Sequence, residues 1–171
     1  MEKNHKRIDL YNMENQIENT DYLEVVKKRV KENEGRRNIV YTDTEGYLTV
    51  GIGYKLPKDS DLKEGDYVDD VFIDDKFNLT FNNAVEGAKR LTKGFNLKEE
   101  AFGVVTEMVF QMGETGVSKF TKTLNYLKNN EYKKASEEML RGKTDGTLSK
   151  WAQQTKNRAI SLSNIIASLE E

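Results

Sequence analysis

The sequence predicts an α+β fold that is mostly α-helical, with a small β-sheet near the N-terminus and a helical remainder. β-branched and aromatic runs with turn residues between them are concentrated in residues 39–53. An amphipathic helical stripe precedes them, and a 3.6-residue apolar period dominates from about residue 80 onward. A helix, a small sheet and then helices in this order are typical of an α+β chain.

The first predicted helix spans residues 21–34. Asp21 is a suitable N-cap, and Glu24 stands three residues on, as a capping box requires. Apolar side chains then recur at helical spacing, and Gly35 suits the position that follows a helix C-terminus. Residues 1–20 are polar and form a separate N-terminal extension, so we expect a single domain over residues 21–171.

A hairpin is expected next. Residues 39–42 (IVYT) and 47–53 (YLTVGIG) are strand-like runs, and the turn signal DTEG separates them. Gly51 and Gly53 in the second run indicate close packing or tight strand geometry. Residues 66–77 (DYVDDVFIDDKF) are read as another short strand or an acidic loop, which gives a small N-terminal lobe over about 35–80.

The rest of the chain is predicted to be helical. Thr80 is the expected cap of a helix that ends at Gly94. Residues 96–116 are apolar on all sides, so they are expected to form a buried central helix. Further helices are expected at about 118–129, 131–141 and 157–170, which makes residues 96–171 a helical C-terminal lobe.

Composition restricts the possible functions. The 29 acidic and 27 basic side chains give a net charge of −2, which does not favour nucleic-acid binding. With no Cys and a single His, His5 in the polar extension, disulfides and a zinc site are not expected, and no other cofactor is indicated. No segment resembles a membrane-spanning helix or a secretory signal, so we expect no stable membrane insertion and synthesis in a cytoplasm.

Two carboxylates stand out. Glu34 falls in the last turn of the first helix and Asp43 at the tip of the hairpin, so one cleft can hold both. Glycoside hydrolysis needs such a pair: one carboxyl donates a proton to the leaving oxygen, and the other assists water. Thr49 on the next strand is placed to hold a water. Spacing alone does not separate this interpretation from ordinary solvated charges at a helix end and a turn.

A wider pattern resembles a known family. Glu34, eight intervening residues, Asp43, five more and Thr49, within NEG…YTDTEGYLTVGIGY, is similar to the catalytic signature of the T-even phage lysozymes, glycoside hydrolase family 24. MVFQMGETGVSKFT (108–121) and SKWAQQTKNRA (149–159) resemble two further blocks of the family, in the same order.

The resemblance implies a lysozyme-like, two-lobed fold and an inverting muramidase that cuts peptidoglycan between N-acetylmuramic acid and N-acetylglucosamine. It implies that Glu34 is the acid, Asp43 the second carboxylate and Thr49 the residue that positions water. Arg158 matches an Arg that orients the catalytic Glu. Residues in the later blocks match positions near the glycan cleft; they are Phe110, Gln111 and Gln154. Periodicity favours Phe110 at least equally as a core aromatic. Trp151 is expected to pack between the lobes, with stacking on a sugar as the alternative.

Several residues depart from the family pattern. Tyr54 stands where familiar members carry a His, and Glu107 replaces a neutral amide next to Arg158. A carboxylate there is expected to compete for the guanidinium or to change the acidity of Glu34. The chain is also slightly acidic, whereas familiar members are cationic. A local basic cluster has two interpretations, a compensating cationic patch beside the cleft or a solvated helix face; its members are Lys27, Lys28, Arg29, Lys31, Arg36 and Arg37.

Three functional hypotheses follow. The first is a phage endolysin that acts as a monomer, waits in the host cytoplasm and reaches the cell wall when a holin opens the inner membrane. The second is a virion-associated lysozyme that docks through residues 1–20. The third is a glycan-binding protein that has lost catalysis, against which the presence of Glu34, Asp43 and Thr49 argues.

Overall fold

The computed structural model describes residues 21–144 and 146–171, which form two compact units. The sheet unit comprises residues 27–83, and the helical unit comprises residues 21–26 together with the described residues from 84 onward. The boundary falls inside helices α2 (Asp21–Glu34) and α3 (Asp70–Leu91), so each helix contributes to both units. The predicted α+β class, mostly helical with one small sheet, is confirmed. The predicted N-terminal extension lies outside the described residues.

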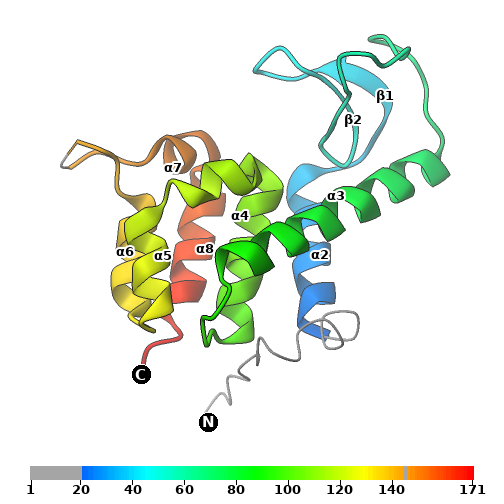
Figure 1. The fold of residues 1–171 in the computed structure, drawn as a ribbon. Helices are drawn as coiled ribbons and strands as arrows, with labels where there is room; N and C mark the ends of the chain where they lie inside the picture. The colour runs from blue at the N-terminus through cyan, green and yellow to red at the C-terminus, as the bar shows by residue number, and fades with distance from the viewer. Residues whose placement is uncertain (1–20, 145) are drawn as a thin grey trace. The chain divides into compact units, whose positions relative to one another are not determined.

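The sheet unit contains a three-stranded antiparallel sheet in the order β1 (Arg37–Thr42), β2 (Leu48–Gly51) and β3 (Tyr54–Lys55). Figure 1 labels the first two of these strands. The predicted hairpin is therefore confirmed, but its second strand is shorter than expected. Gly51 and Gly53 have φ angles of +68° and +65°, which turn the chain out of β2 and into the third strand.

Tyr41 on β1 lies opposite Thr49 on β2, and Thr49 lies opposite Lys55 on β3. Directly opposed residues of antiparallel strands project to the same face of a sheet. The three side chains therefore form a row across one face of the sheet.

Helix α2 ends where the sequence predicts. Gly35 has a φ angle of +71° and donates its N–H to the Lys31 carbonyl at 3.0 Å, which closes the last turn. The chain reverses at once into β1, so Glu34 stands at the junction of helix and sheet.

Helix α3 corrects two predictions. Residues 70–77 are neither strand nor loop but the first turns of α3, which is capped by Asp69: its Oδ1 accepts the Phe72 N–H at 2.8 Å. Thr80 lies inside the helix, where its hydroxyl donates to the Lys76 carbonyl at 2.9 Å. The apolar stripe that begins at Ile73 and continues through Phe77 decides the structure over the acidic residues around it.

The helical unit contains five further helices, of which α4, α5, α6 and α8 correspond to predicted segments. They are α4 (Glu99–Ser118), α5 (Thr121–Lys128), α6 (Tyr132–Leu140), α7 (Lys150–Thr155) and α8 (Asn157–Ala167). Helix α8 packs against α4, α6 and α7, and α5 packs against α6 (Figure 1). The central position predicted for α4 is confirmed by an unbroken buried run over residues 101–109.

Two details of this unit escaped prediction. Gly113 interrupts α4 with φ 78° and ψ 163°, so the helix kinks before its last turn. Helix α7 is a separate short helix with Ser149 as its N-cap: the Ser149 Oγ accepts the Ala152 N–H at 3.2 Å.

Candidate active site

Asp43 is held by the turn it begins. Its main-chain N–H donates to the Tyr47 carbonyl at 2.8 Å, and its carbonyl accepts from Gly46 at 3.0 Å. Its side-chain Oδ1 accepts two more main-chain N–H groups, from Glu45 at 2.9 Å and from Tyr47 at 2.8 Å. These four hydrogen bonds fix the carboxylate relative to the sheet.

The two oxygens of Asp43 have different surroundings. Oδ1 is occupied by the two main-chain donors, whereas Oδ2 lies 3.5 Å from the Thr49 hydroxyl and 3.8 Å from the Lys55 ammonium. The Thr49 hydroxyl has one proton and lies closer to the Tyr47 carbonyl, at 3.1 Å. Whichever of these two acceptors takes the proton, the lone pairs of the Thr49 oxygen remain to accept a hydrogen bond from a water.

This environment keeps Asp43 ionised. Partial burial of the carboxyl raises its pKa, but the N–H groups of Tyr47 and Glu45, the Lys55 charge and the Thr49 hydroxyl together lower the pKa below its ordinary value. At neutral pH Asp43 is therefore a carboxylate, which suits a group that accepts a proton or stabilises positive charge and does not suit a proton donor.

Glu34 is placed against the same hairpin. A Cβ built on Gly53 would lie 2.6 Å from Glu34 Oε2 and 3.1 Å from its Cδ, so the carboxyl group rests directly over the Gly53 α-carbon. Sequence reasoning predicted close packing at this glycine, and the structure identifies the packed group as the predicted acid. Glu34, Asp43 and Thr49 thus all belong to the sheet unit.

Tyr54, which departs from the family pattern, packs edge-on against Phe72 at 6.3 Å between ring centroids. Lys76 lies 5.5 Å from the centroid of each of these two rings. The position is therefore filled by an aromatic cluster that ties β3 to α3.

The predicted orienting residue lies in the helical unit. Arg158 Nε donates to Glu107 Oε1 at 3.2 Å, and Glu107 is completely buried. The expectation that Glu107 neighbours the guanidinium is confirmed. A carboxylate with no solvent exposure requires a cation or several donors, and Arg158 supplies the charge.

Gln111 is held by Trp151, whose indole N–H donates to Gln111 Oε1 at 2.6 Å. The Gln111 side-chain amide nitrogen is buried and makes no hydrogen bond to the described residues. Trp151 also packs edge-on against Phe120, with 6.1 Å between ring centroids. The indole therefore serves packing and orientation within the helical unit. The side-chain N–H groups of Gln111 are therefore available to donate a hydrogen bond.

The remaining two candidate substrate contacts are also in the helical unit. Phe110 on α4 is half-buried, and Gln154 on α7 is exposed. Neither assignment is tested by the arrangement, and both stay predictions.

The basic cluster is largely engaged by the protein itself. Lys27 lies 5.4 Å from the Phe81 ring centroid and Lys31 lies 5.0 Å from that of Phe77, as cation–π contacts. Arg36 pairs with Asp70 at 3.1 Å and with Asp74 at 2.8 Å. These contacts hold α2 and β1 to α3, so the structure favours the interpretation of a solvated, internally paired helix face.

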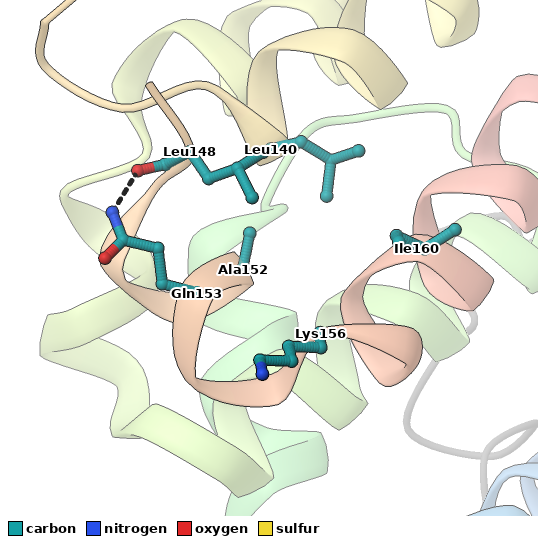
Figure 2. A pocket seen from close by; sticks show the side chains of 6 residues that line it. All are labelled: Leu140, Leu148, Ala152, Gln153, Lys156 and Ile160. Carbon is teal, nitrogen blue, oxygen red and sulfur yellow. Dashed lines mark hydrogen bonds between the residues drawn. The ribbon is translucent and has the colours of Figure 1, made fainter.

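The helical unit also contains an open hollow of about 450 Å³. Figure 2 shows the side chains that line it: Leu140, Leu148, Ala152, Gln153, Lys156 and Ile160. The Gln153 amide donates to the Leu148 carbonyl at 2.8 Å, which leaves a mainly apolar lining. A sugar chain needs several polar partners, so this lining does not favour a glycan.

Metal-ligand clusters and helices suited to cross a membrane are both absent from residues 21–144 and 146–171. These residues contain no group of three or more acidic, His or Cys side chains arranged to hold a metal ion. Across the same residues, no helix has the length and apolarity needed to cross a membrane.

Comparison with known families agrees with this geometry. The family model described as phage lysozyme matches residues 31–159, which include Glu34, Asp43, Thr49 and Arg158. This match places the chain among the lysozyme-type glycoside hydrolases. The chain belongs to the phage lysozyme family.

Two relatives support the assignment. The probable T4-type lysozyme 2 of Dictyostelium discoideum is 28% identical over 157 residues, which cover 78% of this chain and 88% of the relative. The probable T4-type lysozyme 1 of the same organism is 24% identical over 164 residues, which cover 82% and 92%. Family membership supports a lysozyme activity with peptidoglycan as its substrate.

Proposed function

We propose that this protein is an inverting muramidase that hydrolyses the β-1,4 bond between N-acetylmuramic acid and N-acetylglucosamine in peptidoglycan. The observation that carries the proposal is the Asp43 carboxylate. Its Oδ1 is fixed by the main chain, and its Oδ2 is left beside the Thr49 hydroxyl, in the same unit as Glu34. An inverting glycosidase needs one carboxylic acid and one carboxylate that activates water.

The proposed reaction is a single displacement. Glu34 gives its proton to the glycosidic oxygen as the bond to the anomeric carbon breaks. A water held by Thr49 attacks that carbon, and its proton passes to Asp43 Oδ2. The products are a new reducing end and a new hydroxyl, and Asp43 returns its proton to solvent as Glu34 is reprotonated.

The first experiment measures the release of reducing ends from purified peptidoglycan by the native chain and by Glu34→Gln. We expect release from the native chain and none from the variant, because Gln keeps the shape of Glu34 but has no acidic proton. No release from either folded protein would leave only glycan binding. Equal release from both would show that another group is the acid. NMR of the first product anomer tests inversion.

The biological role that we propose is that of a phage endolysin. In this role the monomeric enzyme stays in the host cytoplasm and reaches the wall through a holin-opened membrane. Expression in a bacterial host, with and without a co-expressed holin, tests this proposal: rapid lysis should require both proteins and should be absent with Glu34→Gln. Lysis without the holin would contradict it.

A second candidate role is a cellular lysozyme outside phage infection. The observation that favours it is that both reported relatives come from Dictyostelium discoideum. A virion-associated lysozyme remains a third hypothesis, which requires a docking partner for residues 1–20. Detection of the protein in purified phage particles would favour the third hypothesis over the other two.

A further inference from the structure

The site contains a cation that the proposed reaction has not yet used. Lys55 on β3 places its ammonium 3.8 Å from Asp43 Oδ2 and 3.3 Å from Glu45 Oε2. The same ammonium lies 4.3 Å from the centroid of the Tyr47 ring. All three partners come from the turn that carries Asp43.

Strand register and the contacts of the ammonium together define where the Lys55 side chain lies. Lys55 is the cross-strand partner of Thr49, so its side chain leaves the sheet on the face that carries the Thr49 hydroxyl. The long alkyl stem then carries the ammonium over Tyr47 and toward the turn. Its side chain remains 51% exposed, so the ammonium is anchored by its contacts and not by burial.

The contact is selective for one oxygen of Asp43. Oδ1 is already occupied by the main-chain N–H groups of Glu45 and Tyr47. Oδ2 is the oxygen beside Thr49, and it is the oxygen that Lys55 approaches. A positive charge at this distance favours the ionised carboxylate and disfavours its protonation.

We propose that Lys55 is a positioning residue for the hydrolytic reaction, which keeps Asp43 Oδ2 ionised and directed toward the Thr49 water site; this proposal rests on the muramidase function proposed above. Lys55 acts through Asp43 and does not itself touch the reacting atoms. The ammonium also offsets the charge of Glu45, which would otherwise repel the carboxylate across the turn.

Other charged or titratable groups of the described sheet unit lie on or beside the same strands and turn. They are Glu45 and Tyr47 on the turn, Tyr41 opposite Thr49, Arg37 stacked on Tyr41 at 4.2 Å, and Glu34 at Gly53. Of these, Arg37 is the only other cation, and its guanidinium stacks on an aromatic ring. Lys55 is therefore the cation whose loss should change the protonation of Asp43.

The test uses Lys55→Met, which preserves the length of the stem, and Lys55→Arg, which restores the charge. Lys76→Met is the matched control, because Lys76 also lies over aromatic rings of the sheet unit. The first measurement is the NMR titration of the Asp43 side-chain carboxyl in each full-length protein. The second is the pH dependence of kcat/KM for the release of reducing ends.

We expect Lys55→Met to move the Asp43 titration midpoint and the acidic limb of kcat/KM to higher pH by the same amount. Below the native midpoint, kcat/KM should fall several-fold, and at neutral pH KM should be unchanged. Lys55→Arg should restore most of the native profile, and Lys76→Met should resemble the native protein.

Three results would overturn the proposal. One is an unchanged Asp43 midpoint in Lys55→Met, and another is an equal shift in Lys76→Met. The third is a higher KM in Lys55→Met with no shift in the acidic limb of kcat/KM, which would make Lys55 a substrate-binding residue. The carboxyl titration needs no turnover, so it tests the contact between Lys55 and Asp43 even if the native protein proves to release no reducing ends.

Discussion

Glu34 rests on Gly53: the carboxyl of the proposed acid occupies the space in which any other residue at position 53 would place its Cβ, 2.6 Å from Oε2. This contact links the end of α2 to the bend between β2 and β3. The glycine therefore has two roles, to adopt a φ angle of +65° and to leave room for the acid.

The first prediction is that Gly53→Ala lowers the activity by more than its loss of stability can explain. The Cβ would push the flexible carboxyl of Glu34 aside, and a displacement of about 1 Å in a reacting group can cost about a hundredfold in rate. Backbone strain at positive φ should add a loss of about 1–2 kcal/mol in the free energy of unfolding. Release of reducing ends and urea denaturation measure the two effects.

Gly65→Ala is the matched control. Gly65 also has a positive φ angle, +93°, but a Cβ there would have no heavy atom within 4 Å. It should show a similar loss of stability with near-native kcat. Similar kcat values for the two variants would contradict the proposed contact between position 53 and the acid.

The second prediction separates the charge of Asp43 from its hydrogen bonds. Asp43→Asn keeps a side-chain oxygen that accepts the N–H groups of Glu45 and Tyr47, so the turn should persist while reducing-end release is lost. Asp43→Ala removes both hydrogen bonds and should cost about 1–3 kcal/mol, taking about 0.5–1.5 kcal/mol for each. Urea denaturation compares the variants, and equal stability of Asn and Ala would contradict this interpretation.

The stability of the native protein should also depend on pH through Asp43, a dependence that Asp43→Asn lacks. Because the pKa of Asp43 is lower in the folded protein than its ordinary value, ionisation of Asp43 stabilises the fold above the unfolded-state pKa. That contribution is lost as the pH falls through the folded-state pKa. The free energy of unfolding of the native protein relative to that of Asp43→Asn, measured by urea denaturation at a series of pH values, should therefore be largest at neutral pH and should decrease in acid.

Local signals in the sequence were sufficient for much of the fold. The hairpin, the end of α2 at Gly35 and the buried run of α4 depend on turn residues, a C-terminal glycine and apolar periodicity. The start of α3 was missed because four Asp residues over 69–75 resemble a loop. The apolar stripe of α3 is buried only when the sheet packs against it, and that packing is not visible in the sequence.

The site was only partly predictable. The spacing in the sequence identifies Glu34 and Asp43 as candidates, and the resemblance assigns their roles. Neither shows which contacts position the two side chains. Lys55 was missed because its relation to Asp43 depends on strand register: it lies opposite Thr49 only in the pairing of β2 with β3. The third strand was not predicted, since two residues are too few to give an alternating pattern.

The third prediction concerns Trp151 and Gln111. Trp151→Phe keeps an aromatic ring near Phe120 but removes the indole N–H, so Gln111 Oε1 loses its donor in a part-buried site. We expect a loss of about 1–3 kcal/mol, measured by urea denaturation. The double variant Trp151→Phe with Gln111→Met should lose less free energy of unfolding than the two single variants lose together. Additive losses would show that the hydrogen bond contributes little.

The last prediction concerns the ion pair of Glu107 and Arg158. Arg158→Met should remove the Arg158 guanidinium from the buried carboxylate and cost about 3 kcal/mol or more, since breaking one side of a buried pair typically costs about 3–5 kcal/mol. The double variant Glu107→Leu with Arg158→Met should be more stable than Arg158→Met alone, because the apolar pair leaves no buried charge. Glu107→Gln, which retains an acceptor for Arg158 Nε, should lose less stability than Glu107→Leu. A double-mutant cycle by urea denaturation measures the coupling, and strictly additive single effects would show that Arg158 does not compensate the charge of Glu107.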